Sequence, residues 1–227
     1  MSQNILKNKS SQIDLSVYIK SFLLLMKPRV MSLVLFTAMV GLLVAPVTVS
    51  FTTASLSLLA VAIGSGAAGA LNMWYESDVD ALMSRTCLRP IPTGKIKREQ
   101  ALLFGIILSF ISIVMLYLSS NLISALLLAA TISFYFFIYT IWLKRKTAQN
   151  IVIGGAAGAL PPVIGWAVAM NNISLEPIVM FLIIFIWTPS HFWALSLYKF
   201  KDYEKAKIPM LPITAGIEKT KLNILVY

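Results

Sequence analysis

The apolar run Ala54-Ser-Leu-Ser-Leu-Leu-Ala-Val-Ala-Ile-Gly-Ser-Gly-Ala-Ala-Gly-Ala-Leu71 is followed at once by Asn72-Met-Trp-Tyr-Glu-Ser-Asp-Val-Asp80. The apolar part is long enough for a helix that crosses a membrane. A helix that merely leaves a bilayer needs no carboxylates, whereas this one ends in three of them within five residues, Glu76, Asp78 and Asp80. The junction therefore predicts a membrane helix that leads into a polar functional segment.

The polar segment has the spacing of one helix face. Positions four apart on an α-helix drift by only about 40° per step, so Asn72, Glu76 and Asp80 are predicted to share a face. Carboxylate and amide oxygens suit Mg²⁺ that also binds a substrate's phosphates, and Arg85 and Arg89 downstream suit the phosphates themselves. We therefore expect a diphosphate site at a membrane surface. The alternative is a solvated, charged helix end.

The composition identifies an integral membrane protein. The chain has 58% hydrophobic and 12% charged residues, and its mean hydropathy is +0.82. These values lie far from those of a soluble domain. Long apolar runs predict six complete transmembrane helices and the start of a seventh near Leu222, at about 30–48, 54–74, 101–119, 121–142, 151–170 and 176–198. We expect an all-α polytopic fold with a polar N-terminal segment (1–20) and a transmembrane domain (21–227) that is incomplete at its C-terminus.

The charges lie on one side of this predicted topology. All 19 Lys and Arg residues fall in residues 1–29, at the N-terminal side of the first span, or in the loops 75–100, 143–150 and 199–221, whereas the opposite loops carry only Glu176. By the positive-inside rule, the N-terminus and the charged loops face the cytoplasm. The net charge of +10 thus reflects topology and gives no reason to expect a nucleic-acid partner. A bacterial inner membrane fits best, with a mitochondrial inner membrane as the alternative.

Two further cytoplasmic loops carry candidate residues. Lys144 and Arg145 follow the fourth predicted span, where an ordinary positive-inside loop is the simpler interpretation. Asp202 follows the sixth span much as Asp80 follows the second, although a lone Asp among lysines is usually a solvated ion pair. His191, the only histidine, lies inside the sixth span, and a polar residue there is either functional or hydrogen-bonded to another helix.

Several long motifs resemble one known family. The run Ala70-Leu-Asn-Met-Trp-Tyr-Glu-Ser-Asp-Val-Asp-Ala81 is similar to the first motif of the UbiA superfamily of intramembrane prenyltransferases, and in particular to its haem-farnesylating branch. The resemblance extends in the same order over nearly the whole chain, through residues 27–30, 85–95, 139–150, 153–166, 187–195 and 202–212.

The resemblance implies a bundle of nine helices around a central cavity. It also implies transfer of a farnesyl group from farnesyl diphosphate to the vinyl group of haem b, and a possible association with haem A synthase or terminal oxidase assembly. The implied Mg²⁺ (or Mn²⁺) ligands, which are also the catalytic residues, are Asn72, Glu76, Asp80 and Asp202. The implied diphosphate contacts are Arg85, Arg89, Lys144 and Arg145, and His191 is a candidate haem contact.

The sequence departs from the superfamily pattern at two places. The middle position of the first motif is usually Asp and is Glu76 here, which moves the carboxylate by one methylene. The second motif usually has at least two aspartates, whereas this chain has Asp202 alone, beside Lys199 and Lys201. Both departures affect the expected metal geometry.

Two other functions compete with haem farnesylation. A related UbiA-type enzyme prenylates a quinone precursor; the motif His191-Phe-Trp-Ala-Leu195 argues against this function. A small-solute transporter would have ionisable residues near the membrane midplane, whereas here nearly all of them cluster at one face. A catalytic cavity that opens toward the cytoplasm is therefore the preferred interpretation.

The topology is testable by cysteine labelling. In a Cys87→Ser background, single cysteines at positions 50 and 173 should react with an impermeant reagent from outside the cell. Cysteines at positions 95 and 204 should react only from the cytoplasmic side, because their loops hold the positive charge. The reverse accessibility would overturn the predicted orientation.

Overall fold

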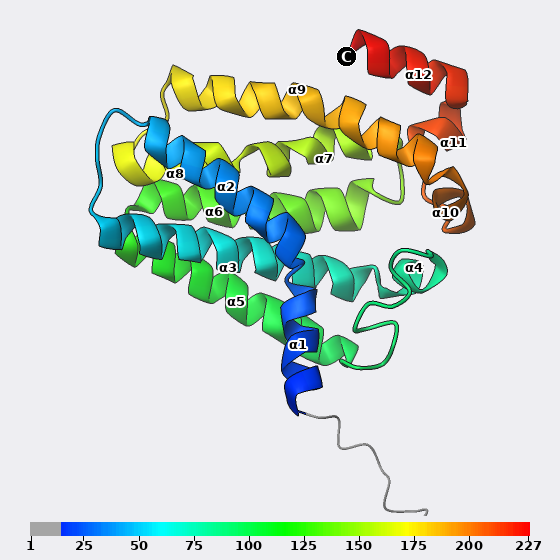
Figure 1. Ribbon diagram of the computed structural model, residues 1–227, viewed down its shortest axis with the longest axis horizontal. Helices are drawn as coiled ribbons and strands as arrows, with labels where there is room; N and C mark the ends of the chain where they lie inside the picture. Colours follow the sequence, from blue (N-terminus) through cyan, green and yellow to red (C-terminus); the bar gives the residue numbers. More distant parts are fainter. Residues whose placement is uncertain (1–14) are drawn as a thin grey trace, which may run out of the picture.

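Long apolar helices run side by side along the molecule in the computed structural model, which describes residues 15–227 (Figure 1). Within these residues, five helical spans are long and apolar enough to cross a membrane. They are α3 (Phe51–Tyr75), α5 (Arg98–Ser119), α6 (Leu122–Ser133) with the π-helix η1 (Phe134–Leu143), α7 (Asn150–Ala159) with α8 (Pro161–Met170), and α9 (Leu175–Tyr198). The chain is therefore an all-α, multi-pass membrane protein, which confirms the predicted fold class.

The five spans agree with the predicted apolar runs to within three residues at each end. The first predicted span differs, because it is replaced by a bent pair of helices, α1 (Leu15–Leu25) and α2 (Pro28–Val44). Residues 15–20, predicted as part of a polar segment, belong to α1, and residues 1–14 lie outside the described residues. The seventh predicted run falls in α12 (Ile217–Val226).

The bend between α1 and α2 is set at Lys27. This residue has a left-handed backbone (φ 53°), and Pro28, which has no backbone N–H, opens the next helix. The two helix axes meet at 49°, so α1 crosses the bundle instead of continuing along it (Figure 1). The bend carries the Lys27 side chain into the bundle, where it lines a cavity.

The span of α7 and α8 is interrupted at Leu160, just before Pro161 and Pro162. Neither proline has a backbone N–H to donate, so the hydrogen-bond ladder is interrupted and the helix restarts at Pro161. The proline pair thus interrupts the span that the sequence presents as one apolar run at 151–170. It separates the glycine-containing α7 from the almost wholly buried α8.

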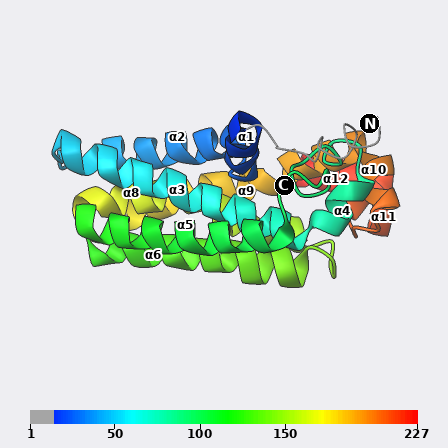
Figure 2. The ribbon, with the colours of Figure 1, turned by 90° about the horizontal axis from the view of Figure 1, so that it is seen from below.

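Short helices gather at one end of the bundle (Figure 2). They are α4 (Ser77–Leu82), α10 (Phe200–Lys205) and α11 (Leu211–Ala215). A buried apolar cluster joins them to the start of α7, through Val79, Met83, Ile151, Tyr203 and Ile208. Loops that are more than 100 residues apart in sequence are thereby held at the same end of the molecule.

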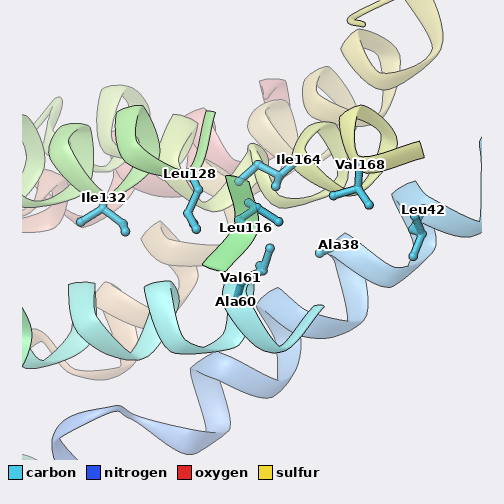
Figure 3. Close-up of a cluster of buried hydrophobic side chains, with 9 residues drawn as sticks. All are labelled: Ala38, Leu42, Ala60, Val61, Leu116, Leu128, Ile132, Ile164 and Val168. Atoms are coloured by element: carbon cyan, nitrogen blue, oxygen red, sulfur yellow. The ribbon is translucent and has the colours of Figure 1, made fainter. Parts of the chain in front are cut away.

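The main core lies between α2, α3, α5, α6 and α8 (Figure 3). Close helix packing on its α2–α8 side depends on glycines. A Cβ atom added at Gly165 would overlap the Ala38 carbonyl, and one added at Gly41 would overlap the Pro162 carbonyl. Small residues therefore let the two backbones touch, as expected for membrane helices.

Gly165→Ala should destabilise the fold, because the new methyl group can be accommodated only if the α2 backbone moves. Overpacking of this kind costs about 1–3 kcal/mol. Gly158→Ala is the matched control, because no atom lies within 4 Å of the added Cβ there. Thermal unfolding in one detergent should show a lower midpoint for the first variant only. Equal midpoints would mean that α2 and α8 do not pack this closely.

Candidate active site

The polar segment at the end of α3 keeps its helical spacing across a break. Although α3 ends at Tyr75, the backbone N–H of Glu76 donates to the Asn72 carbonyl (3.0 Å) and that of Asp80 to the Glu76 carbonyl (2.8 Å). Asn72, Glu76 and Asp80 are 1%, 2% and 3% exposed, whereas the Asp78 side chain is 61% exposed. The predicted shared face therefore exists, and it is buried.

A chain of side-chain contacts links three helical segments at this face. The Lys27 ammonium donates to Asn72 Oδ1 (2.5 Å), and Asn72 Nδ2 donates to Glu76 Oε2 (2.9 Å) and to Thr140 Oγ1 (3.1 Å). Lys144 Nζ donates to the same Glu76 oxygen (2.5 Å). Asn72 is thus held at both ends of its amide, and Glu76 is held between an amide and an ammonium.

The two other carboxylates of the segment, Asp80 and Asp78, each form an ion pair with an arginine. Arg89 Nη1 contacts both Asp80 oxygens, at 2.8 and 2.7 Å, and the Thr86 hydroxyl donates to the Asp80 carbonyl. On the exposed side, the Arg145 guanidinium forms a bidentate pair with Asp78 (2.9 and 2.7 Å). The buried and exposed carboxylates therefore have different cationic partners.

These contacts favour the ionised forms of Glu76 and Asp78. Burial raises the pKa of Glu76. The charge of the Lys144 ammonium and the hydrogen bonds that Glu76 accepts from Lys144 and Asn72 have a larger opposite effect, so the pKa of Glu76 lies below its usual value. The hydrogen bonds from Arg145 lower the pKa of Asp78. At neutral pH the site therefore presents negative charge that cations neutralise, as burial of a carboxylate requires.

Asp202 is tied to the loop that follows α4. Its carboxylate accepts from the Ser84 hydroxyl (2.7 Å) and weakly from the Ser84 backbone N–H (3.4 Å), and the hydroxyl contact lowers the pKa of Asp202. Beside it, Arg85 donates to the Tyr203 hydroxyl (3.0 Å). The two loops predicted to lie on one side are thus in contact. Among the described residues, however, no three His, Cys, Asp or Glu side chains are grouped closely enough to hold a metal ion.

The π-helix η1 brings two of its residues and the next lysine to the site. In a π-helix, hydrogen bonds join residues five apart, as between the Lys144 N–H and the Tyr139 carbonyl (3.0 Å). Thr140 contacts Asn72, and the Lys144 ammonium lies 5.6 Å from the centre of the Tyr139 ring. The π-helical turn therefore places the Tyr139 ring and the Lys144 ammonium on the same side of the span.

An apolar cavity of about 120 Å³ opens beside this network. Lys27 and Tyr135 are part of its wall, so its polar end adjoins the Lys27–Asn72 contact. The remaining wall is almost entirely apolar and comes from α2, α3, α6, α7 and α8, including Val34, Val61, Leu128, Ile132, Gly158 and Ile164. The predicted central cavity thus exists and has one charged end.

His191 lies away from this cavity wall, on an exposed side of α9. Its ring stacks on Trp187 (centroids 4.5 Å apart, planes at 19°) and meets the edge of Phe192 (5.4 Å). The structure therefore does not join His191 to the charged network of α3.

Sequence reasoning missed three residues of this site: Lys27, Tyr135 and Thr140. Lys27 precedes the first predicted span, and Tyr135 and Thr140 lie inside the predicted span 121–142, so none of the three stands among the charged loop residues. The available signal was a cation or a hydroxyl within a long apolar segment, which is a functional hypothesis in membrane proteins.

Comparison with known proteins identifies the class. The profile of the UbiA prenyltransferase family matches residues 34–227, and the chain belongs to this family. The fold agrees: a UbiA homolog from Archaeoglobus fulgidus, solved with GPP and Mg²⁺, superposes with a TM-score of 0.78 at 20% identity, covering 91% of this chain and 73% of that one. An apo UbiA homolog from Aeropyrum pernix K1 gives 0.64 at 19% identity, covering 88% and 74%.

Within this family, the chain is most informatively compared with two curated relatives of the same name. The chain is 67% identical over 228 residues to the protoheme IX farnesyltransferase of Pelagibacter ubique (strain HTCC1062), covering 100% of this chain and 75% of that protein. It is 54% identical over 222 residues to the protoheme IX farnesyltransferase of Ehrlichia ruminantium (strain Welgevonden), covering 98% and 75%.

Two neighbouring aspartates should differ in their effect on prenyl transfer. Asp80→Asn removes a buried charge from the predicted metal and diphosphate site and should lower kcat by at least about 100-fold. Asp78→Asn breaks only an exposed ion pair and should change kcat by less than about fivefold. The comparison requires steady-state kinetics on variants with matched amounts of folded protein. Equal losses would show that the buried face has no special role.

Proposed function

We propose that this protein transfers the farnesyl group of farnesyl diphosphate to a vinyl group of haem b, giving a hydroxyethylfarnesyl haem (haem O). One observation carries the proposal: a buried network of cations and carboxylates adjoins an apolar cavity. A prenyl diphosphate needs both, because its head is highly charged and its tail is apolar. The names of the close relatives supply the identity of the acceptor.

The cations of the network bind the diphosphate in this proposal. Arg85, Arg89, Lys144 and Arg145 are the residues expected from the sequence, and Lys27 joins them because it lies at the polar end of the cavity. Arginine suits bidentate contacts with phosphate oxygens, and lysine supplies a compact charge. In the free protein, three of these cations are paired with carboxylates at 2.5–2.8 Å or, for Arg145, at 2.7–2.9 Å.

The oxygen donors of the site fit a divalent metal. Glu76 and Asp80 are buried on one face beside the Asn72 amide, and such hard oxygens suit Mg²⁺ or Mn²⁺ that is also bound to phosphates. Bound there, the metal would supply positive charge to the diphosphate leaving group. Since Lys144 and Arg89 now cover Glu76 and Asp80, we infer that binding exchanges partners: the lysine and arginine turn to phosphate as the carboxylates are released. Asp202 would contribute only after it leaves Ser84.

Bond breaking depends on charge stabilisation at the leaving group. The C1–O bond breaks with both electrons remaining on the diphosphate, and Lys27, Lys144 and Arg89 stabilise the charge that builds there. The vinyl π electrons of haem then form the new C–C bond to C1. Water adds to the cation left on the vinyl substituent and releases a proton, which completes the hydroxyethyl group. Until then, the apolar wall around the tail shields the allylic cation from water.

The setting of the reaction follows from the fold and the charges. We propose a bacterial inner membrane, with the N-terminus and the site cytoplasmic, because Arg85, Arg89, Lys144 and Arg145 lie at the end that collects the short helices. His191, stacked on Trp187, remains a proposed contact for the flat haem ring. Haem A synthase or the terminal oxidase assembly would be the recipient of the product.

The function is tested by extracting haem from membranes that contain the protein. Incubation with haem b, farnesyl diphosphate and Mg²⁺ should give a later-eluting haem on reversed-phase chromatography, heavier than haem b by one farnesyl group and one hydroxyl group. Because the site is built from oxygen ligands, EDTA should abolish the new species, and Mg²⁺ or Mn²⁺ should restore it.

Membranes with the Asp80→Asn variant are the control. If membranes with the wild-type protein form no farnesylated haem, the proposal is contradicted. If they prenylate 4-hydroxybenzoate instead, the protein has the competing UbiA-type function. Undiminished turnover after thorough chelation would refute the metal assignment alone.

A further inference from the structure

Tyr135 stands at the junction between the charged network and the cavity. It lines the cavity in company with Lys27, whose ammonium contacts Asn72. Gly158 also lines this cavity, and a Cβ atom added there would meet no atom within 4 Å. A substrate with its diphosphate at Lys27 and its tail among the apolar residues must therefore pass Tyr135 with its allylic carbons.

Tyr135 is one half of an aromatic pair. Its ring centre lies 5.3 Å from that of Tyr139, with the planes at 34°. Tyr139 in turn has the Lys144 ammonium 5.6 Å from its ring centre, within the range of a cation–π contact. The pair thus extends from a lysine of the charged network to the cavity wall.

Neighbouring backbone segments hold Tyr139 in place. A Cβ atom added at Gly154 would overlap the ring of Tyr139, so α7 packs directly against this side chain. The π-helical hydrogen bond from the Lys144 N–H to the Tyr139 carbonyl holds the lysine near the same ring. Tyr139 is therefore packed directly against α7, and Tyr135 lies in ring contact with it.

We propose that Tyr135 is a catalytic residue whose aromatic ring stabilises the allylic cation, with Tyr139 extending the same surface toward the leaving group. The proposal rests on the proposed function. As the C1–O bond breaks, the electron pair stays on the diphosphate and the positive charge spreads over C1 and C3 of the prenyl chain. The negative face of an aromatic ring attracts this charge without forming a bond to it.

An aromatic ring suits this position better than a carboxylate. Lys27 and Lys144 lie close by, and a carboxylate there would pair with them and draw them away from the diphosphate. A neutral ring leaves both lysines free for the leaving group and still lowers the energy of the cation. The hydroxyl group of Tyr135 has no part in this role.

Three variants separate the ring from the hydroxyl and from packing. Tyr135→Phe should keep kcat within about threefold, whereas Tyr135→Leu should lower kcat at least about 30-fold, equivalent to ~2 kcal/mol. Phe137→Leu is the matched control, because it removes a ring from the same π-helix at a side chain that is 58% exposed. The Kd of farnesyl thiolodiphosphate, a slowly ionising analogue, should stay within about threefold for all three variants.

Fluorinated phenylalanines at position 135 keep the shape of the ring and guard against misfolding of the leucine variant. Each added fluorine weakens the negative face of the ring, so log kcat should fall steadily while the Kd of the analogue holds. A wild-type rate for Tyr135→Leu, a flat fluorine series, or a loss in Tyr135→Phe as large as in Tyr135→Leu would overturn the proposal. Failure of the wild-type protein to farnesylate haem would instead reject the proposed function.

Discussion

Buried carboxylates at the end of α3 require cations against them, because an ionised group in a low-dielectric interior is costly unless it is paired. This requirement ties the site together. Glu76 takes Lys144 from the end of η1, Asp80 takes Arg89 from the following loop, and Lys27 reaches Asn72 from the bend between α1 and α2. Segments that share no local sequence are thus held at one end of the bundle by charge pairing.

The same pairing prepares the site for its proposed ligand. A site of unpaired lysines and arginines would repel itself, and unpaired carboxylates would be protonated or would unfold the segment. Paired with each other, Glu76 and Lys144 can exchange partners when an anion and a cation arrive together. Neither a metal ion nor a diphosphate alone satisfies both groups, so we infer that the two bind as a unit.

The apolar part of the molecule follows a different constraint. Membrane helices gain little from burying apolar surface that lipid covers equally well, so close packing must hold them together. Glycines make this close packing possible. Gly165 and Gly41 let the backbones of α2 and α8 touch, and Gly154 leaves room for the ring of Tyr139. Around Gly158 the same α7 leaves open space. The distribution of glycines thus decides which helix surfaces are in contact and where the cavity remains.

The sequence by itself determined five of the spans, because helix length and apolar composition are local properties. It also determined the shared face of Asn72, Glu76 and Asp80, because four-residue spacing persists across the break at Glu76. It also determined the break before Pro161, since proline lacks the backbone donor. Only the tertiary structure decided which side chains contact one another in the site. The contact of Lys27 with Asn72, the contact of Lys144 with Glu76, and the contact of Asp202 with Ser84 all join segments that are distant in sequence. No local pattern encodes these contacts, because each is stabilised by a neighbour that only the folded bundle supplies.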